Sequence, residues 1–262
     1  MKRFEGKVVF ITGVARGQGR EHAVRFAAEG ASIIGIDICS DLPSVWYPLA
    51  TEADLAETTR RIEEVGGASV LKVADVRDRR AMREVVKEGV ERFGRLDVIC
   101  ANAGTYSPSP TEWMSDDAWD ETIDINLSGV FYGMKYQIAA MLKNGGGSII
   151  NMASILGSVG FATAPAYTAA KHGVVGLTKA AAIEYSAHGV RINAVGPAFI
   201  HTPMISGLEQ DAGINAMLVG AHPIGRLGQP EEVAELVTWL ASSKASFVTG
   251  AYYPVDGGYL AR

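Results

Sequence analysis

Short apolar runs rich in β-branched residues alternate with helical stretches along the whole chain of 262 residues. The runs predict seven strands: Lys7–Thr12, Ser32–Asp37, Ser69–Ala74, Asp97–Ala101, Gly147–Met152, Val190–Val195 and Ala251–Val255. The stretches between them predict helices: Gly19–Glu29, Glu52–Val65, Arg79–Phe93, Asp117–Leu142, Pro165–Ala187 and Glu231–Ala241. Because strands that alternate with helices through right-handed links form parallel sheets, the pattern predicts a doubly wound α/β fold, with helices on both faces of a seven-stranded parallel sheet.

No stretch of the chain has the composition of a linker, and no internal repeat divides it, so we expect one domain that spans residues 1–262. Two segments interrupt the alternation, because Ile38–Ala50 and Ala198–Gly228 are longer than a link between elements requires. Ligands bind doubly wound sheets at the carboxyl ends of the strands, where such loops gather. We therefore expect both segments to serve a binding site, with residues 198–228 as the substrate loop. The alternative for each is a surface loop without function.

The composition argues against several classes of function. The net charge of −5 gives no reason to expect nucleic acid or an acidic membrane surface as a partner. No apolar run reaches the length of a membrane span, and the first residues lead into a strand without an apolar signal region. Two cysteines, Cys39 and Cys100, and five scattered histidines offer no disulfide framework and no metal cluster. We therefore expect a cytoplasmic protein that works without a metal.

The turn after the first predicted strand contains three glycines, Gly13, Gly17 and Gly19, and it leads directly into a helix. Glycines in this position let the backbone turn tightly and approach a diphosphate, which the free N–H groups and the dipole of the helix then bind. Three glycines alone are a weak signal because turns use glycine anyway. Their place at the first strand, first turn and first helix predicts a dinucleotide-binding site of the Rossmann type.

Asp37 ends the second strand, about 20 residues beyond the glycines, where an acidic residue is expected to bond the ribose hydroxyls of adenosine. Its charge should also repel the 2′-phosphate of NADP, at a cost of about 4 kcal/mol for two charges about 4 Å apart at an effective dielectric of about 20. Arg16, inside the glycine loop, favours the opposite choice, because it could reach a 2′-phosphate. Asp37 is expected to lie nearer the ribose, so we expect NAD as the cofactor.

Four motifs in the same order resemble the short-chain dehydrogenase/reductase family: Thr12–Gly19, Asn102–Gly104, Tyr167–Lys171 and Asp256–Gly258. The resemblance covers essentially the whole chain, and it implies that Asp75 and Val76 contact the adenine, that Asn102–Gly104 flank the cofactor, and that Ile200 and Thr202 hold the nicotinamide carboxamide. The full set of residues implied to bind the cofactor is Gly13, Arg16, Gly17, Gln18, Gly19, Asp37, Ile38, Asp75, Val76, Asn102, Ala103, Gly104, Tyr167, Lys171, Pro197, Ile200 and Thr202. The chain departs from the family at Pro197-Ala198, where a Pro-Gly pair is usual.

Tyr167 and Lys171 are four residues apart on a predicted helix that Pro165 opens, so both side chains project from one face. A free phenol titrates near 10, and a neighbouring ammonium group favours the phenolate. The resemblance implies that Tyr167 exchanges a proton with the substrate oxygen, that Lys171 lowers its pKa and grips the nicotinamide ribose, that Ser154 hydrogen-bonds the substrate oxygen, and that Asn126 holds a water in a proton relay. An amphipathic helix face and an ordinary helix cap are the alternatives for the Tyr–Lys pair and for Ser154.

The stretches Thr12–Val24, Asp37–Cys39 and Tyr47–Thr58 are similar to the carveol-dehydrogenase-like branch of the family, which is often called mycofactocin-coupled. That branch implies NAD and the oxidation of terpenoid or other cyclic secondary alcohols, with an external carrier that takes the electrons. The substrate loop agrees with a hydrophobic ligand, because it mixes apolar side chains with few charges. Beyond Gly104 the chain resembles the family in general.

Three other functions remain as alternatives. An NADPH-dependent ketone reductase is favoured by Arg16 alone. A sugar-nucleotide epimerase or dehydratase also uses a Tyr-x-x-x-Lys pair, but such chains have tighter glycine spacing and an added substrate domain, for which 262 residues leave no room. A non-catalytic dinucleotide sensor has no need of an acid/base group.

The family resemblance implies a homotetramer, in which the small residues of Pro165–Ala187 let that helix approach the helix before it in another subunit. We also expect the Ile38–Ala50 loop to cover the adenosine end of the cofactor, with Trp46 and Tyr47 as flat apolar covers that slow NAD release. The alternative makes that loop a subunit contact.

Overall fold

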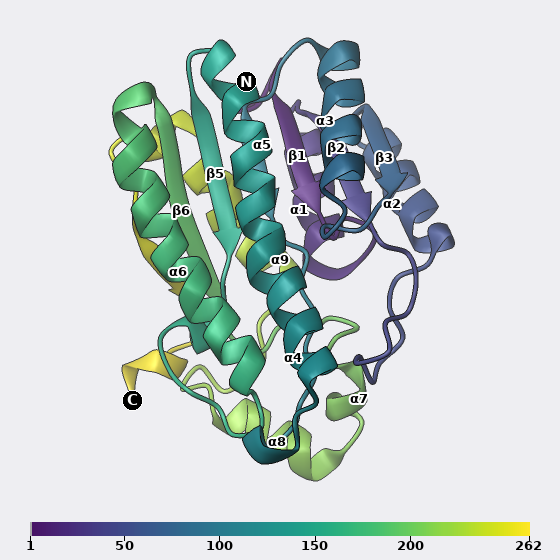
Figure 1. Ribbon diagram of the computed structural model, residues 1–262, viewed down its shortest axis with the longest axis vertical. Coiled ribbons are helices and arrows are strands. Elements are labelled where there is room, and N and C mark those ends of the chain that lie inside the picture. Colours follow the sequence, from purple (N-terminus) through teal and green to yellow (C-terminus); the bar gives the residue numbers. More distant parts are fainter. Residues whose placement is uncertain (1) are drawn as a thin grey trace.

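Seven parallel strands form a single sheet in a computed structural model that describes residues 2–262 (Figure 1). The strands are β1 (Val8–Thr12), β2 (Ser32–Asp37), β3 (Ser69–Val73), β4 (Val98–Ala101), β5 (Gly147–Met152), β6 (Val190–Pro197) and β7 (Tyr252–Val255). Their order across the sheet is β3-β2-β1-β4-β5-β6-β7, and each neighbouring pair is parallel. The predicted fold class is therefore confirmed.

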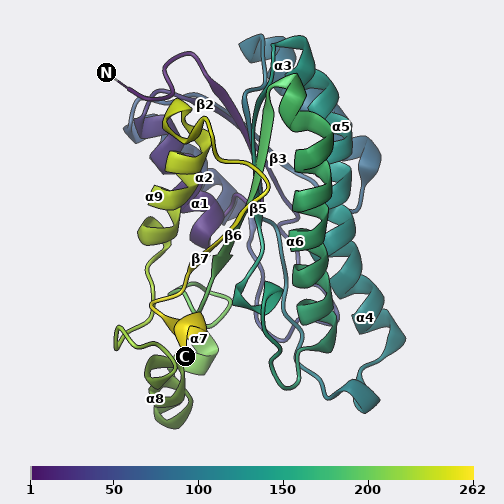
Figure 2. The same cartoon turned by 90° about the vertical axis from the view of Figure 1, so that its left-hand side faces the viewer.

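Helices cover both faces of the sheet, as the edge-on view in Figure 2 shows. One face carries α1 (Gly17–Ala28), α2 (Glu52–Glu64) and α9 (Pro230–Ala241), and α1 packs against both of its neighbours. The other face carries α3 (Arg79–Phe93), α4 (Asp116–Ile123), α5 (Gly129–Lys143) and α6 (Pro165–Tyr185). Two short helices, α7 (Ser206–Glu209) and α8 (Ala212–Gly220), lie beyond the carboxyl ends of the strands.

The sheet separates two hydrophobic cores. Phe26 of α1 and Val237 of α9 belong to the first core, and Met82 of α3 and Met141 of α5 belong to the second, where they pack against side chains such as Phe10 of β1. All five residues of β1 are buried, as expected for a strand with helices on both faces. Each large apolar side chain in such a core contributes roughly 1.5–3 kcal/mol by its burial, so the scaffold that positions the loops is rigid.

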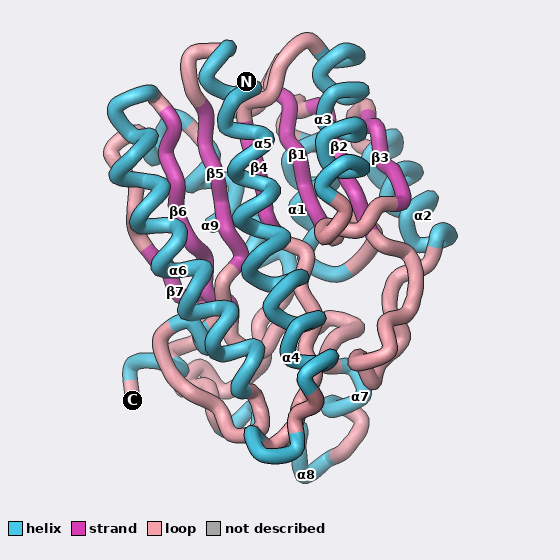
Figure 3. The backbone as a smooth tube through the Cα atoms, in the orientation of Figure 1, coloured by secondary structure: helices cyan, strands magenta, loops and turns pink. Residues whose placement is uncertain are grey.

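The order of the strands creates a crevice at one edge of the sheet. The chain runs outward from β1 to β2 and β3, then returns across β1 to β4 and continues in the other direction. The loops that follow β1 and β4 therefore diverge at their carboxyl ends, which is where doubly wound sheets bind ligands. Figure 3 shows loops and short helices gathered at this edge.

Two segments differ from their predicted form. The single helix predicted over Asp117–Leu142 is α4 and α5, joined by one turn of π-helix at Asp124–Ser128. The substrate loop, predicted without helices, contains α7 and α8. The side chain of Asp211 caps α8 by accepting hydrogen bonds from the N–H groups of Gly213 and Ile214, at 2.9 Å each. Within residues 2–262 no helix combines the length and the apolar character that a membrane span requires.

Candidate active site

The glycine loop after β1 is closed so tightly that side chains would not fit. A Cβ at Gly19 would lie 1.9 Å from the carbonyl oxygen of Gly13, and a Cβ at Gly13 would lie 2.9 Å from the Cα of Ala103. Gly13 also has a φ of +67°, which L side chains rarely adopt. The loop therefore needs glycine at both positions, and its backbone is the surface that a ligand would meet.

The beginning of α1 has the properties of an anion site. The N-cap residue, Arg16, makes no side-chain cap, and the first turn contains no acidic residue. The first N–H groups of a helix have no partner within the helix, and the dipole makes this end positive. Together with the glycine loop, this end of α1 fits the diphosphate of a dinucleotide.

A cleft runs from this loop along the carboxyl ends of β2, β3 and β4. Most of the residues predicted to bind the cofactor line it: Gly13, Arg16, Gly17, Gln18, Gly19, Asp37, Ile38, Asp75, Val76, Asn102, Ala103, Gly104 and Thr202. Pro197, Ile200 and Tyr167 instead line a second cavity, which shares Gln18, Thr202 and Met204 with the first. The cleft therefore has the shape and the surroundings of a dinucleotide site, and it opens into the second cavity.

Asp37 stands at the end of β2 with its carboxylate fixed by the backbone. Oδ2 accepts a hydrogen bond from the N–H of Ala15 at 2.9 Å, and Oδ1 accepts one from the N–H of Cys39 at 3.3 Å. Burial raises the pKa of this carboxyl above its usual value, and the two backbone hydrogen bonds work in the opposite direction. Arg16 is the residue whose position in the sequence favoured NADP. In the structure its guanidinium donates a hydrogen bond to the carbonyl of Pro48. It therefore helps to hold the Ile38–Ala50 loop.

Two other predicted residues also shape the cleft through contacts with the protein. The Asn102 side-chain amide donates to the carbonyls of Thr12 at 2.9 Å and Gly13 at 3.1 Å, which fixes the glycine loop against the end of β4. The Asp75 carboxylate accepts from Nε and Nη2 of Arg77, at 2.8 and 2.6 Å. Asn102 thus acts on the backbone around the cofactor cleft.

The second cavity has a volume of about 320 Å³ and is predominantly apolar. No charged side chain belongs to its lining among residues 2–262, and most of its walls come from the substrate loop and from the segment after β5. The apolar side chains that line it are Trp46, Pro108, Ala153, Ile155, Leu156, Phe161, Pro197, Ala198, Phe199, Ile200, Met204, Ile205, Leu208, Ile214, Met217 and Leu218. Such a cavity suits an uncharged, hydrophobic ligand.

Ser154 and Tyr167 bring two hydroxyl groups together in this cavity. Ser154 follows β5, and Tyr167 lies in the first turn of α6, which Pro165 opens. Burial raises the pKa of the Tyr167 phenol, and a hydrogen bond with the Ser154 hydroxyl opposes this shift. This raised pKa of Tyr167 is opposite to the lowered pKa that was expected from the presence of Lys171. The physical reason is that the phenolate would lose its hydration in an apolar cavity.

Lys171 lies beneath Tyr167, buried to all but 3% of its surface. Its Nζ is 5.4 Å from the centre of the Tyr167 ring and donates a hydrogen bond to the Met152 carbonyl at 2.8 Å. Burial lowers the pKa of this ammonium group to about 8. Lys171 is thus placed one helical turn from Tyr167, as predicted, although it lines neither cavity directly.

Asn126 lies in the π-helical turn between α4 and α5 and is completely buried. Its Nδ2 donates to the carbonyls of Thr105 and Thr122, at 3.0 and 2.9 Å, and its Oδ1 accepts from the N–H of Thr105 at 3.3 Å. A Cβ at Gly104 would lie 2.7 Å from Oδ1 of Asn126 and 3.5 Å from Nζ of Lys171. Asn126, Gly104 and Lys171 therefore lie side by side at the end of β4. The role of Asn126 in a proton relay stays a prediction.

The Ile38–Ala50 loop divides its two aromatic side chains between the cavities. Tyr47 is buried and lines the cofactor cleft, as expected for a cover of the cofactor. Trp46 does not cover the cofactor cleft, which corrects that prediction, and instead lines the apolar cavity. The two neighbouring residues therefore each contribute a side chain to a different cavity.

The sequence also left two features of the site undetected. The ring of Tyr106 packs edge-on against Tyr167, with 5.5 Å between the ring centres, and nothing in the sequence around it indicates an aromatic partner. Thr163, another residue of the cavity, has a φ of +63°, a strained conformation for a β-branched residue. Ala198, in contrast, is not among the described residues with positive φ, so the backbone accepts alanine where the family usually has glycine.

Comparison with known proteins gives matches over nearly the whole chain. A family model described as "Enoyl-(Acyl carrier protein) reductase" matches residues 13–260. A cyclohexanol dehydrogenase from Acinetobacter sp. (strain SE19) is 41% identical over 264 residues, which cover 99% of this chain and 97% of that protein. A (−)-trans-carveol dehydrogenase from Rhodococcus erythropolis is 38% identical over 274 residues, which cover 98% of this chain and 99% of that protein.

A solved structure is similar in its entire fold. The crystal structure of a carveol dehydrogenase from Mycobacterium avium in complex with NAD matches this structure with a TM-score of 0.96. The two sequences are 38% identical, and the match covers 100% of both chains.

Proposed function

The chain belongs to the short-chain dehydrogenase/reductase family, and we propose that it oxidises hydrophobic, cyclic secondary alcohols to ketones with NAD. The family and its carveol-dehydrogenase-like branch are those that the motifs predicted. Coupling to an external electron carrier stays a prediction.

One observation carries the choice of substrate. The hydroxyl groups of Ser154 and Tyr167 stand together in a predominantly apolar cavity of about 320 Å³ that opens into the dinucleotide cleft. A carbinol oxygen can bond to these hydroxyls while the rest of the molecule contacts apolar walls. Relatives named for cyclohexanol and carveol, both cyclic secondary alcohols, support this substrate class.

The residues of the site have separate roles in the oxidation. When bound, NAD supplies the acceptor for the hydride of the carbinol carbon. Ser154 binds the carbinol oxygen, and Tyr167 takes the proton from it, which is general-base catalysis. Lys171 places a buried amine one helical turn below the phenol, where its charged form would stabilise the phenolate as the proton is taken. Asn126, beside Gly104 and Lys171, would continue the path along which the proton leaves.

The choice of NAD rests on Asp37. Its carboxylate is fixed at the end of β2 in the cofactor cleft, while Arg16 is engaged with the Pro48 carbonyl. A carboxylate at this position accepts hydrogen bonds from ribose hydroxyls and repels a 2′-phosphate. The NADPH-dependent alternative therefore has little support from this geometry.

A substrate panel tests the proposed function. Purified protein is given cyclohexanol, carveol and, for each of them, the linear primary alcohol of the same carbon number, all with NAD and with NADP. We expect reduced cofactor to form much faster from the cyclic alcohols with NAD than from the linear alcohols or with NADP. If the linear alcohols are preferred, or if no cyclic alcohol is oxidised, the proposed function is wrong.

We also propose that the protein is a homotetramer that works in the cytoplasm. The helices α4, α5 and α6, which cover one face of the sheet, expose large apolar side chains to the outside, among them Trp119, Phe131 and Ile183. Exposed apolar surface of this kind is typical of an interface. The two cysteines, Cys39 and Cys100, are free thiols, which fits a reducing compartment.

A further inference from the structure

Trp46 is a large aromatic residue at the mouth of the apolar cavity, and the mechanism described above makes no use of it. It is 46% exposed, whereas its neighbour Tyr47 is buried against the cofactor cleft. The two rings meet edge-on, with 5.6 Å between their centres. An exposed indole beside an apolar cavity is costly unless something covers it, and a ligand in the cavity would do so.

The loop holds Trp46 in place on its amino-terminal side. The Ser44 hydroxyl and N–H both donate to the Glu121 carboxylate of α4, and the Ser107 hydroxyl donates to the Ser44 carbonyl at 2.6 Å. Glu121 in turn accepts a hydrogen bond from Arg77 at 3.0 Å. Ser44 is thus tied to the rest of the protein only two residues before Trp46.

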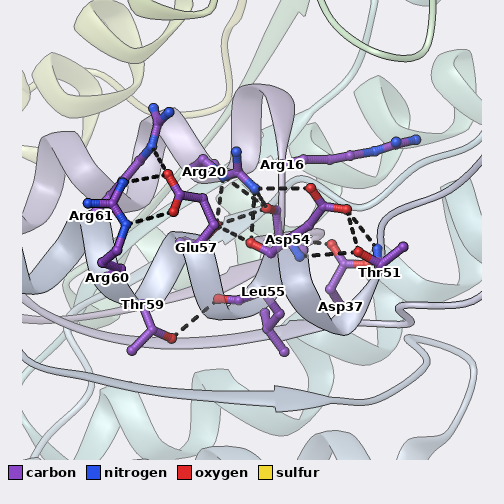
Figure 4. Close-up of polar contacts among 12 residues, drawn as sticks. Arg16, Arg20, Asp37, Thr51, Asp54, Leu55, Glu57, Thr59, Arg60 and Arg61 are labelled. Atoms are coloured by element: carbon purple, nitrogen blue, oxygen red, sulfur yellow. Dashed lines mark hydrogen bonds and ion pairs between the residues drawn. The ribbon is translucent and has the colours of Figure 1, made fainter.

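The carboxyl-terminal side of the loop is also held. Pro48 accepts a hydrogen bond from Arg16, and the first turn of α2 begins soon after with a capping box between Thr51 and Asp54. Figure 4 shows this box together with Arg20, which donates to both the backbone and the side chain of Asp54. With anchors on both sides, Trp46 forms a fixed wall of the cavity.

The indole also contacts the substrate loop. A Cβ at Gly207 of α7 would lie 3.1 Å from Cζ3 and 3.3 Å from Cη2 of Trp46, so the ring lies directly over the glycine. In Figure 1 the loop after β2 extends beside α7. Two segments about 160 residues apart in sequence therefore meet beside the cavity at this contact.

We propose that Trp46 is a specificity-determining residue, which limits the size of the cyclic alcohol that the cavity accepts. This inference rests on the proposed function. A single six-membered ring bound at the catalytic hydroxyls shares this cavity with the indole and can gain apolar contact from it. A fused two-ring alcohol extends further from the hydroxyls, toward the indole, and the anchored loop cannot move aside at low cost.

The experiment compares kcat/KM for cyclohexanol with kcat/KM for a decahydronaphthol, in the wild type, Trp46→Phe and Trp46→Ala. Removing the indole should raise the ratio of decahydronaphthol to cyclohexanol by roughly tenfold or more in Trp46→Ala, since the contact of one large apolar side chain is worth about one to two powers of ten. Trp46→Phe should give a smaller increase. The Kd of NAD should stay within about twofold of the wild-type value, because Trp46 does not line the cofactor cleft.

A pair of glycine variants provides an independent test that keeps the tryptophan. Gly207→Ala places a methyl group against the indole and should change the ratio, whereas Gly220→Ala in α8, where a Cβ would meet open space, should not. A ratio that is unchanged in Trp46→Ala while cyclohexanol is still oxidised would overturn the role of Trp46 and leave the proposed function intact. A raised Kd of NAD in Trp46→Ala, with an unchanged ratio of the two kcat/KM values, would also overturn this role and would assign the indole to cofactor binding. A wild type that oxidises neither alcohol overturns the proposed function and, with it, this inference.

Discussion

Replacing Asp37 by asparagine should relax the choice between NAD and NADP. The substitution keeps the size of the side chain and an oxygen that can accept from the N–H of Ala15, so the turn after β1 should persist. It removes the negative charge that would face a 2′-phosphate. The perturbation is therefore almost purely electrostatic.

The magnitude follows from Coulomb's law. Two unit charges about 4 Å apart repel by about 4 kcal/mol at an effective dielectric of about 20, which corresponds to roughly a thousandfold in affinity. The cleft is open to solvent, so this value is an upper limit, and a shift of ten- to a thousandfold in the ratio of the two dissociation constants is expected. The affinity for NAD itself should fall, since an amide accepts hydrogen bonds from ribose less strongly than a carboxylate.

The assay is equilibrium titration of the protein with NADH and with NADPH, followed by the fluorescence of the bound cofactor. Asp41→Asn is the matched control, because it removes an equal charge from the same loop at a residue outside the cofactor cleft. Burial raises the Asp37 pKa, so the wild-type preference for NADH should also weaken as the pH falls through that raised value. A wild type that binds NADPH as tightly as NADH, or an Asp37→Asn ratio equal to that of the wild type, would refute this reasoning.

Three further predictions concern catalysis, cofactor release and assembly. Tyr167→Phe should lower turnover at least ~10²-fold while NAD affinity persists, and near-normal turnover of a folded variant would exclude the acid/base role. Oxidation by the wild type should become faster as the pH rises, because burial raises the pKa of the phenol that must lose its proton. Tyr47→Ala should speed NADH release roughly tenfold in stopped-flow experiments, with Trp46→Ala close to the wild type, and equal release from all three proteins would mean that the loop does not retain the cofactor. Light scattering at micromolar concentration should give four times the mass of 27.8 kDa, and the mass of one chain would contradict the proposed tetramer.

Most of the fold could be predicted because its signals are local. Buried strands such as β1 and β5 are short apolar runs, and each predicted strand agrees with the structure to within two residues at either end. The helix α8 was missed because its residues are almost all apolar or small, so they form no polar face with helical period. Asp211, a good N-cap before this stretch, was the available signal. The π-helical turn at Asn126 has no sequence signature of this kind.

The site was partly predictable for the same reason. Glycines and the Tyr167–Lys171 spacing are local patterns, and the structure places them around one crevice. The direction of the Tyr167 pKa and the placement of Trp46 depend instead on what surrounds them in space. Burial of the phenol is set by side chains from several segments that meet only in space, and Trp46 meets Gly207, a partner about 160 residues away. Periodicity along the chain contains no information about such contacts.

The most direct test of the proposed function follows the hydride itself. Cyclohexanol that carries deuterium on the carbinol carbon is incubated with the protein and NAD, and the cofactor is then analysed by mass spectrometry and proton NMR. We expect cyclohexanone and NADH that carries one deuterium in its nicotinamide ring, in equal amounts. Cyclohexanone formed without deuterium in the cofactor, or no conversion of the alcohol at all, would contradict the central claim that this protein transfers a hydride from a cyclic alcohol to NAD.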